Sequence, residues 1–157
     1  MYRRSLAPFQ NSMLSMAGSL ARGGRYNIRD YFGCLYACFE RDTLQAEMAR
    51  YFTVDPDCGF ADAVISVRLS RVVDLTSEFL LKRLGLSAAQ LLDDSYTLTQ
   101  HVGQSAWSVG VEALIVPSAA ESRRCNLAIL LDNQRAGWAL GLESVTAQTS
   151  RLDPALS

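Results

Sequence analysis

No run of apolar residues in this sequence approaches the roughly 20 that a membrane-spanning helix needs, so we expect no membrane contact. A secretory signal would require an unbroken apolar stretch near the N-terminus. The best candidate, residues 13–21, is interrupted by Ser15, Gly18 and Ser19. These two absences predict a cytoplasmic protein.

Basic charge is not in excess either. The 15 lysines and arginines are balanced by 16 aspartates and glutamates, for a formal net charge of -1. Binding to nucleic acid usually depends on clustered positive charge. This composition therefore predicts no direct contact with nucleic acid.

Residues that commonly bind zinc are scarce. His101 is the sole histidine, and the four cysteines, at positions 34, 38, 58 and 125, include no Cys-x-x-Cys pair. Structural zinc sites need clustered cysteine and histidine. We therefore expect no metal ion, and we expect reduced thiols, as is usual in the cytosol.

Three common motifs of nucleotide-binding and hydrolytic enzymes are also missing. The sequence contains neither the P-loop pattern nor Gly-x-Gly-x-x-Gly, so nothing supports a Walker-type ATP site or a Rossmann site. It contains no Gly-x-Ser-x-Gly, and a single histidine is a poor basis for a serine hydrolase triad.

The residues that are present predict one α+β domain over residues 1–157. The length suits a single domain with its own core, and 49% hydrophobic residues are typical of a globular chain. Predicted strands and helices do not alternate regularly, which favours α+β over a doubly wound sheet. Apolar patterning predicts strands at 31–39, 63–73, 111–116 and 126–131, and a last strand after residue 132.

Capping residues mark the predicted helices. One helix is expected at 77–84 and is ended by Gly85. A second, at 87–92, opens with the capping box Ser87-x-x-Gln90, and apolar periodicity predicts a third at 100–109. Residues 1–22 are expected to hold a short strand or helix, which Gly23 and Gly24 end.

The helix expected from Asp42 carries a carboxylate of special interest. Asp42-x-x-Gln45 is another capping box, and Glu47 lies at the border of the apolar face formed by residues 44, 48 and 51. A partly desolvated carboxylate tends to find a partner. Either Glu47 forms a salt bridge with Arg22 or Arg50, or it binds a ribose hydroxyl and stabilises an oxocarbenium ion.

Arg25 follows two glycines, which let the backbone approach a ligand closely. The planar guanidinium binds phosphate oxygens in pairs. The pattern is equally compatible with a turn arginine in a surface ion pair, and Arg22 is a second candidate for a phosphate-binding residue.

Tyr36 and Ser118 complete the set of candidate residues. Tyr36 lies in the aromatic strand, where it is either a core residue or a platform for a flat heterocycle. Ser118 follows Pro117 at the end of a strand, where its hydroxyl either caps a turn or reaches a ligand.

Taken in order, the segments GGRYN, LYA, the AE of LQAEMARY, VPSAA and NLAILLDN resemble the RES domain, a family named for its arginine, glutamate and serine. The resemblance implies a compact fold similar to the diphtheria-type ADP-ribosyltransferases, with small mixed sheets flanked by short helices. It also implies the toxin of a bacterial toxin–antitoxin module that takes NAD+ as its substrate without a metal, and an Xre-type helix-turn-helix antitoxin that covers the site.

Matching to the family implies roles for individual residues. Arg25, Tyr36 and Glu47 would be catalytic, and Arg25, Tyr36 and Ser118 would bind the substrate. Tyr26 stands where the family often has Trp or Phe. The ADP-ribose acceptor stays open among a protein target, phosphate and water, and the alternative is a non-enzymatic protein-binding module.

Overall fold

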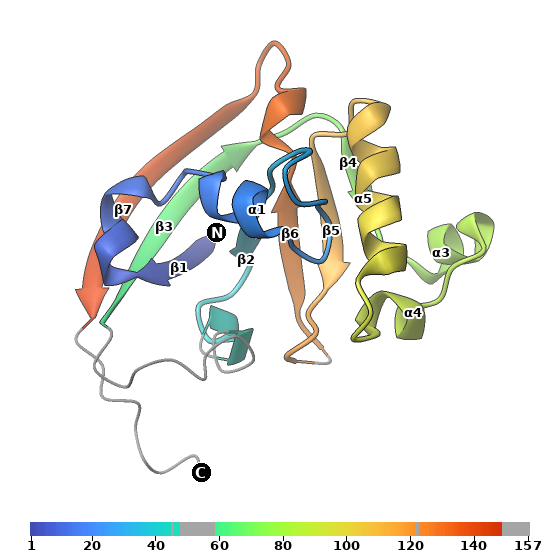
Figure 1. Cartoon of the computed structure of the whole chain (residues 1–157), viewed down its shortest axis with the longest axis horizontal. Coiled ribbons are helices and arrows are strands. Elements are labelled where there is room, and N and C mark those ends of the chain that lie inside the picture. The colour runs from blue at the N-terminus through green and yellow to red at the C-terminus, as the bar shows by residue number, and fades with distance from the viewer. Residues whose placement is uncertain (45, 48–58, 122, 149–157) are drawn as a thin grey trace.

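The computed structural model describes residues 1–44, 46–47, 59–121 and 123–148, and its centre is a seven-stranded sheet in the order β4-β5-β6-β2-β1-β3-β7 (Figure 1). The strands are β1 (Tyr2–Leu6), β2 (Leu35–Cys38), β3 (Phe60–Arg68), β4 (Val72–Asp74), β5 (Ala113–Pro117), β6 (Cys125–Ile129) and β7 (Ala139–Gln148). The helices are α1 (Ala17–Arg22), α3 (Glu78–Leu84), α4 (Ala88–Leu92) and α5 (Thr97–Ser108), with short 3-10 turns η1 (Ala7–Ser12) and η2 (Leu131–Asn133).

The pairing of the strands confirms an α+β architecture. β4 and β5 run parallel, whereas the five other neighbouring pairs are antiparallel. The strands belong to one mixed sheet rather than to several small ones. Among the described residues, the register of β1 and β2 contains the single pair Tyr2 and Cys38, so a short pairing connects the two parts of the sheet.

Side chains alternate between the two faces of the central strands, as the pleat requires. Leu35 and Ala37 of β2 pack into one apolar cluster, together with Leu127 and Ile129 of β6. Tyr36 packs against the second cluster, which contains alternate strand residues and the buried sides of the helices; its members include Leu81, Leu91, Ala106, Leu114, Val116 and Ala128. The central strands are therefore buried on both faces.

The predicted end of one helix at Gly85 and the predicted capping box of another at Ser87 are confirmed. Ser77 accepts a hydrogen bond from the N–H of Leu80, and Gly85 ends α3 in the left-handed conformation, with φ of 68°. Ser87 and Gln90 form the expected capping box at α4. α5 begins at Thr97, three residues before the predicted start at residue 100.

Gly103 lets α5 approach the turn that follows α1. A Cβ atom at this position would lie 2.0 Å from the carbonyl oxygen of Tyr26, which is a severe clash. The absence of a side chain therefore brings the helix directly against the backbone of the GGRYN segment.

The single strand predicted at 63–73 is wrong, because the chain turns between Arg68 and Val72 and forms β3 and β4. These strands lie in different parts of the sheet. The turn is held by Glu112, whose Oε2 accepts hydrogen bonds from the N–H groups of Ser70 (2.5 Å) and Arg71 (2.8 Å). That partner lies about forty residues away, so local patterning did not reveal it.

Part of the segment around Glu47 lies outside the described residues. Residues 43, 44, 46 and 47 are helical, as predicted, and Leu44 is buried. The predicted capping box involves position 45, and the apolar face involves positions 48 and 51. These two predictions, and the turn expected at 55–57, fall on residues that the structure does not describe.

Candidate active site

The Glu47 carboxylate accepts two short hydrogen bonds on one oxygen. The Ser118 hydroxyl donates to Oε1 at 2.5 Å, and the Asn126 side-chain amide donates to the same atom at 2.6 Å. Glu47 is half-buried. Among the described residues, no hydrogen bond is donated to its other oxygen, Oε2. Within the described residues, the carboxylate is therefore held through one oxygen only.

Three elements meet to build this arrangement. Ser118 comes directly after β5, and Asn126 lies on β6, where it pairs with Val116 of β5 and Cys38 of β2. Glu47 lies on the helical segment that follows β2. The residue after β5 and a residue on β6 thus supply the two donors, and the helical segment supplies the acceptor.

Ser118 is itself held tightly. Its hydroxyl oxygen accepts hydrogen bonds from the N–H groups of Ala120 (3.3 Å) and Glu121 (3.1 Å), and its own N–H donates to the carbonyl of Arg124 (2.9 Å). It is only 2% exposed. In this geometry the Ser118 hydroxyl donates its hydrogen bond to Glu47. The predicted contact of Ser118 with the substrate therefore stays a prediction.

Tyr36 anchors the GGRYN turn. Its hydroxyl accepts a hydrogen bond from the N–H of Tyr26 (2.9 Å) and donates to the side-chain oxygen of Asn27 (3.0 Å). A Cβ atom on Gly24 would lie 2.6 Å from this hydroxyl and 2.7 Å from the Asn27 oxygen. The second glycine of the motif therefore makes room for Tyr36 and Asn27.

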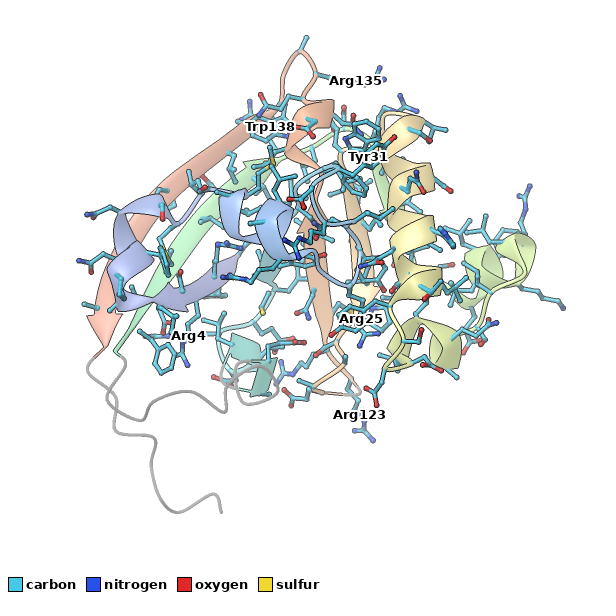
Figure 2. All side chains as sticks on the ribbon, viewed as in Figure 1. Arg4, Arg25, Tyr31, Arg123, Arg135 and Trp138 are labelled. Atoms are coloured by element: carbon cyan, nitrogen blue, oxygen red, sulfur yellow. The ribbon has the colours of Figure 1, made fainter. Side chains whose placement is uncertain are left out.

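Arg25 points from the turn toward α4 (Figure 2) and is 7% exposed. Its Nη1 donates to the carbonyls of Leu91 (3.0 Å) and Asp93 (2.6 Å), and the guanidinium lies over the Tyr96 ring at 4.4 Å. Nη2 donates no hydrogen bond within the described part of the chain. Arg22, the competing candidate, is exposed in the last turn of α1.

The side chains around Tyr36 and those around Glu47 lie on one face of the sheet. Tyr36 and Cys38 are two positions apart on β2, and Cys38 is opposite Asn126. Two residues of a strand span about 7 Å, so the Tyr36 end and the Glu47 end are neighbours along one strand. Burial raises the pKa of the Cys38 thiol to about 12, and the nearby Glu47 charge acts in the same direction. The thiol is therefore neutral at physiological pH.

Two asparagines and a glutamine were missed by the sequence analysis. Asn126 donates the second hydrogen bond to Glu47. It is the first residue of the NLAILLDN segment, which was quoted for the family resemblance alone. Asn27 is fully buried and donates to the carbonyls of Ser19 and Phe32 while it accepts from Tyr36. Gln100 donates to the carbonyl of Gly24 at 3.0 Å. Inspection of the polar residues inside the quoted motifs would have found both asparagines.

A hollow of about 350 Å³ lies beside α4 and α5, lined by Gln90, Asp93, Ser95, Thr97, Leu98 and His101. None of the four predicted site residues lines it. The described residues contain no group of three or more His, Cys, Asp or Glu side chains placed to hold a metal ion. Within the same ranges, no helix has the length and apolar character that crossing a bilayer requires.

The family model of the RES domain matches residues 1–151. The chain belongs to the RES domain family. Of the residues that the sequence analysis matched to the family motifs, the structure brings Glu47 and Ser118 into direct contact.

Two known proteins extend the comparison of this RES domain. A probable NAD(+) phosphorylase of Mycobacterium tuberculosis is 30% identical over 119 residues, which cover 72% of this chain and 56% of that protein. The chain thus spans little more than half the length of that relative. The crystal structure of the M. tuberculosis MbcT–MbcA toxin–antitoxin complex contains a chain with the same fold, with a TM-score of 0.76 and 24% identity over 94% of this chain and 82% of that one.

Proposed function

We propose that this chain is the toxin of a toxin–antitoxin module and that it consumes NAD+. It breaks the bond between nicotinamide and ribose and passes the ADP-ribosyl group to an acceptor. The observation that carries the proposal is the Glu47 carboxylate, held on Oε1 by Ser118 (2.5 Å) and Asn126 (2.6 Å). Membership of the RES family and a relative named as a probable NAD(+) phosphorylase support it.

The chemistry requires charge stabilisation more than proton transfer. When the nicotinamide–ribose bond breaks, its electron pair leaves with nicotinamide, which becomes neutral, and the positive charge passes to the ribose. A fixed carboxylate beside the sugar stabilises this oxocarbenium-like transition state. In the proposal, Glu47 supplies that charge and its Oε2 accepts a hydrogen bond from the ribose 2′-hydroxyl.

The other predicted residues would bind and orient the dinucleotide. Arg25 would hold a phosphate through Nη2, because Nη1 is already bonded to two backbone carbonyls. The Tyr36 ring would orient the nicotinamide, and Asn27 and the Tyr26 N–H hold the Tyr36 hydroxyl in place. Ser118 would act mainly through Glu47, and its direct contact with ribose or amide stays a prediction.

The name of the curated relative favours inorganic phosphate as the acceptor. In that reaction a phosphate oxygen attacks C1′ of the ribose as nicotinamide departs, so one C–N bond breaks and one C–O bond forms. Water as the acceptor would give free ADP-ribose and release a proton. A protein side chain as the acceptor would make the chain an ADP-ribosyltransferase.

Nicotinamide release from NAD+ by the purified protein tests the proposal. We expect release that increases with added phosphate, together with a phosphorylated ADP-ribose identified by mass spectrometry. Release that is independent of phosphate indicates hydrolysis, and release that needs cell extract, with ADP-ribose found on one protein, indicates a transferase. The absence of release under all three conditions would overturn the proposal in favour of a non-enzymatic binding module.

The proposal includes a protein partner, an antitoxin of the Xre helix-turn-helix type that covers the Glu47 end of the sheet. The M. tuberculosis chain that shares this fold was solved in a toxin–antitoxin complex, which supports an antitoxin partner. The Xre type and the covering of the Glu47 end belong to the proposal alone. A candidate antitoxin should elute together with the chain in size-exclusion chromatography and suppress nicotinamide release. An antitoxin that binds without suppressing release would place its contact elsewhere on the surface.

A further inference from the structure

We propose that Asn126 is a positioning residue for the reaction: its amide holds Oε1 of Glu47 so that Oε2 faces the sugar. This inference rests on the proposed function of the Glu47 site. It assigns a role to a residue outside the set of arginine, tyrosine, glutamate and serine predicted from the sequence.

The sheet holds the backbone of Asn126 in place on both sides. Asn126 lies on β6 between β2 and β5, and its backbone is in register with Cys38 on one side and Val116 on the other. Its Nδ2 lies 2.6 Å from Oε1 of Glu47, which is the short distance of a charge-assisted hydrogen bond. A donor on a strand between two neighbouring strands therefore sets the position of a carboxylate that belongs to a different element.

The neutral side chain of Asn126 preserves the negative charge of Glu47. An amide is a neutral donor, so it orients the carboxylate without neutralising it, whereas a lysine or arginine at this place would remove the negative charge that the transition state needs. The nearby arginine on the loop after β5, Arg124, is engaged with the carboxylates of Glu40 and Glu121. Cys38, the thiol opposite Asn126, is neutral because burial raises its pKa to about 12.

The nitrogen and the oxygen of the Asn126 amide differ in their partners. Its Oδ1 is buried and has no hydrogen-bond partner within the described ranges. The contact with Glu47 is therefore the only side-chain hydrogen bond that the described residues give Asn126. An Asn126→Asp change keeps an oxygen at this position and replaces only the NH2 group that donates to Glu47.

Steady-state kinetics of Asn126→Leu and Asn126→Asp test the inference, with nicotinamide release as the readout. Asn126→Leu removes one hydrogen bond to a charged group, so we expect kcat to fall about 10- to 100-fold while KM changes little. Asn126→Asp places two carboxylates in contact, and one of them then retains a proton well above the usual carboxyl range. The kcat of this variant should fall as that proton is lost at higher pH, a transition that the wild type lacks.

Asn11→Asp is the matched control, because Asn11 is exposed on η1 and the substitution adds the same charge. Its kinetics and pH profile should equal those of the wild type. Thermal unfolding of each variant separates loss of fold from loss of catalysis, and Asn126→Asp, the nearly isosteric change, serves if Asn126→Leu does not fold. A pH profile of Asn126→Asp parallel to that of the wild type, with kcat within about twofold, would overturn the inference. No nicotinamide release by the wild type would instead overturn the proposed function.

Discussion

Glu112 and Glu47 are both carboxylates held by hydrogen bonds, and they differ in the groups that donate to them. Glu112 is fully buried, and its Oε2 accepts from the N–H groups of Ser70 and Arg71 and from the Ser70 hydroxyl. Glu47 is half-buried, and its Oε1 accepts from the side chains of Ser118 and Asn126. The Glu112 carboxylate accepts from backbone groups and holds a turn in place, whereas the Glu47 carboxylate is held by two side chains.

The same chemical group thus serves two purposes in this protein. A carboxylate that satisfies buried backbone N–H groups is part of the fold, because its removal leaves those donors without partners. A carboxylate held by side chains can be substituted without leaving a backbone N–H group unpaired. Its charge is therefore available for chemistry, and we expect substitutions in the two regions to separate stability from activity.

The largest effect is expected from Glu47→Gln. Glutamine retains the shape and can still accept from Ser118, but it removes the charge that would stabilise the cationic sugar. We expect nicotinamide release to fall about 100- to 1000-fold and growth inhibition to disappear, while the thermal unfolding temperature changes little.

Glu143→Gln is the matched control for that variant, since Glu143 is exposed on β7. It should retain full activity. Full activity in Glu47→Gln would remove the role given to this carboxylate and would make the two glutamates equivalent.

The second effect is expected from Glu112→Gln and concerns stability. The N–H groups of Arg71 and Ser70 lower the pKa of Glu112. A carboxyl whose pKa is lower in the folded state stabilises the protein above its unfolded pKa, about 4.3, and this contribution is lost as the pH falls through the folded value. Glu112→Gln should therefore lower the thermal unfolding temperature by several degrees at pH 7 and reduce its dependence on pH below about 5.

Thermal unfolding between neutral and acidic pH measures this effect, again with Glu143→Gln as the control. The activity of the folded Glu112→Gln protein should be unchanged at temperatures well below unfolding. Equal unfolding temperatures of wild type and variant at every pH would show that the turn does not depend on the Glu112 charge.

A third effect, again on stability, is expected from Arg25, which shares features of both regions. Its Nη1 is bonded to the carbonyls of Leu91 and Asp93, as in a structural residue, although it is predicted to bind substrate. Arg25→Ala should lower the free energy of unfolding by about 2 kcal/mol, whereas Arg22→Ala, at an exposed position, should change it by no more than about 0.5 kcal/mol. Urea unfolding measures both. Equal stability of the two variants would leave Arg25 with a role in the site alone.

Local signals in the sequence were sufficient for much of the fold. The glycine at position 85 and the capping box that opens at Ser87 predicted α3 and α4, because a cap depends on hydrogen bonds within one turn of a helix. Continuous apolar runs predicted β5 and β6, because central strands are buried on both faces. Where a distant residue controls the backbone, as Glu112 does at residues 70 and 71, local patterning predicted one strand instead of two.

Local signals in the sequence were enough for the class of fold, for the end of α3 and the start of α4, and, through the order of the motifs, for the RES family with Arg25, Tyr36, Glu47 and Ser118 as candidates. The hydrogen bonds that Ser118 and Asn126 donate to Glu47 became visible in the tertiary structure alone. These hydrogen bonds join residues 71 and 79 positions apart in the chain. They depend on the register of β5 and β6 and on where the helical segment lies against them, and the pattern of neighbouring residues specifies neither.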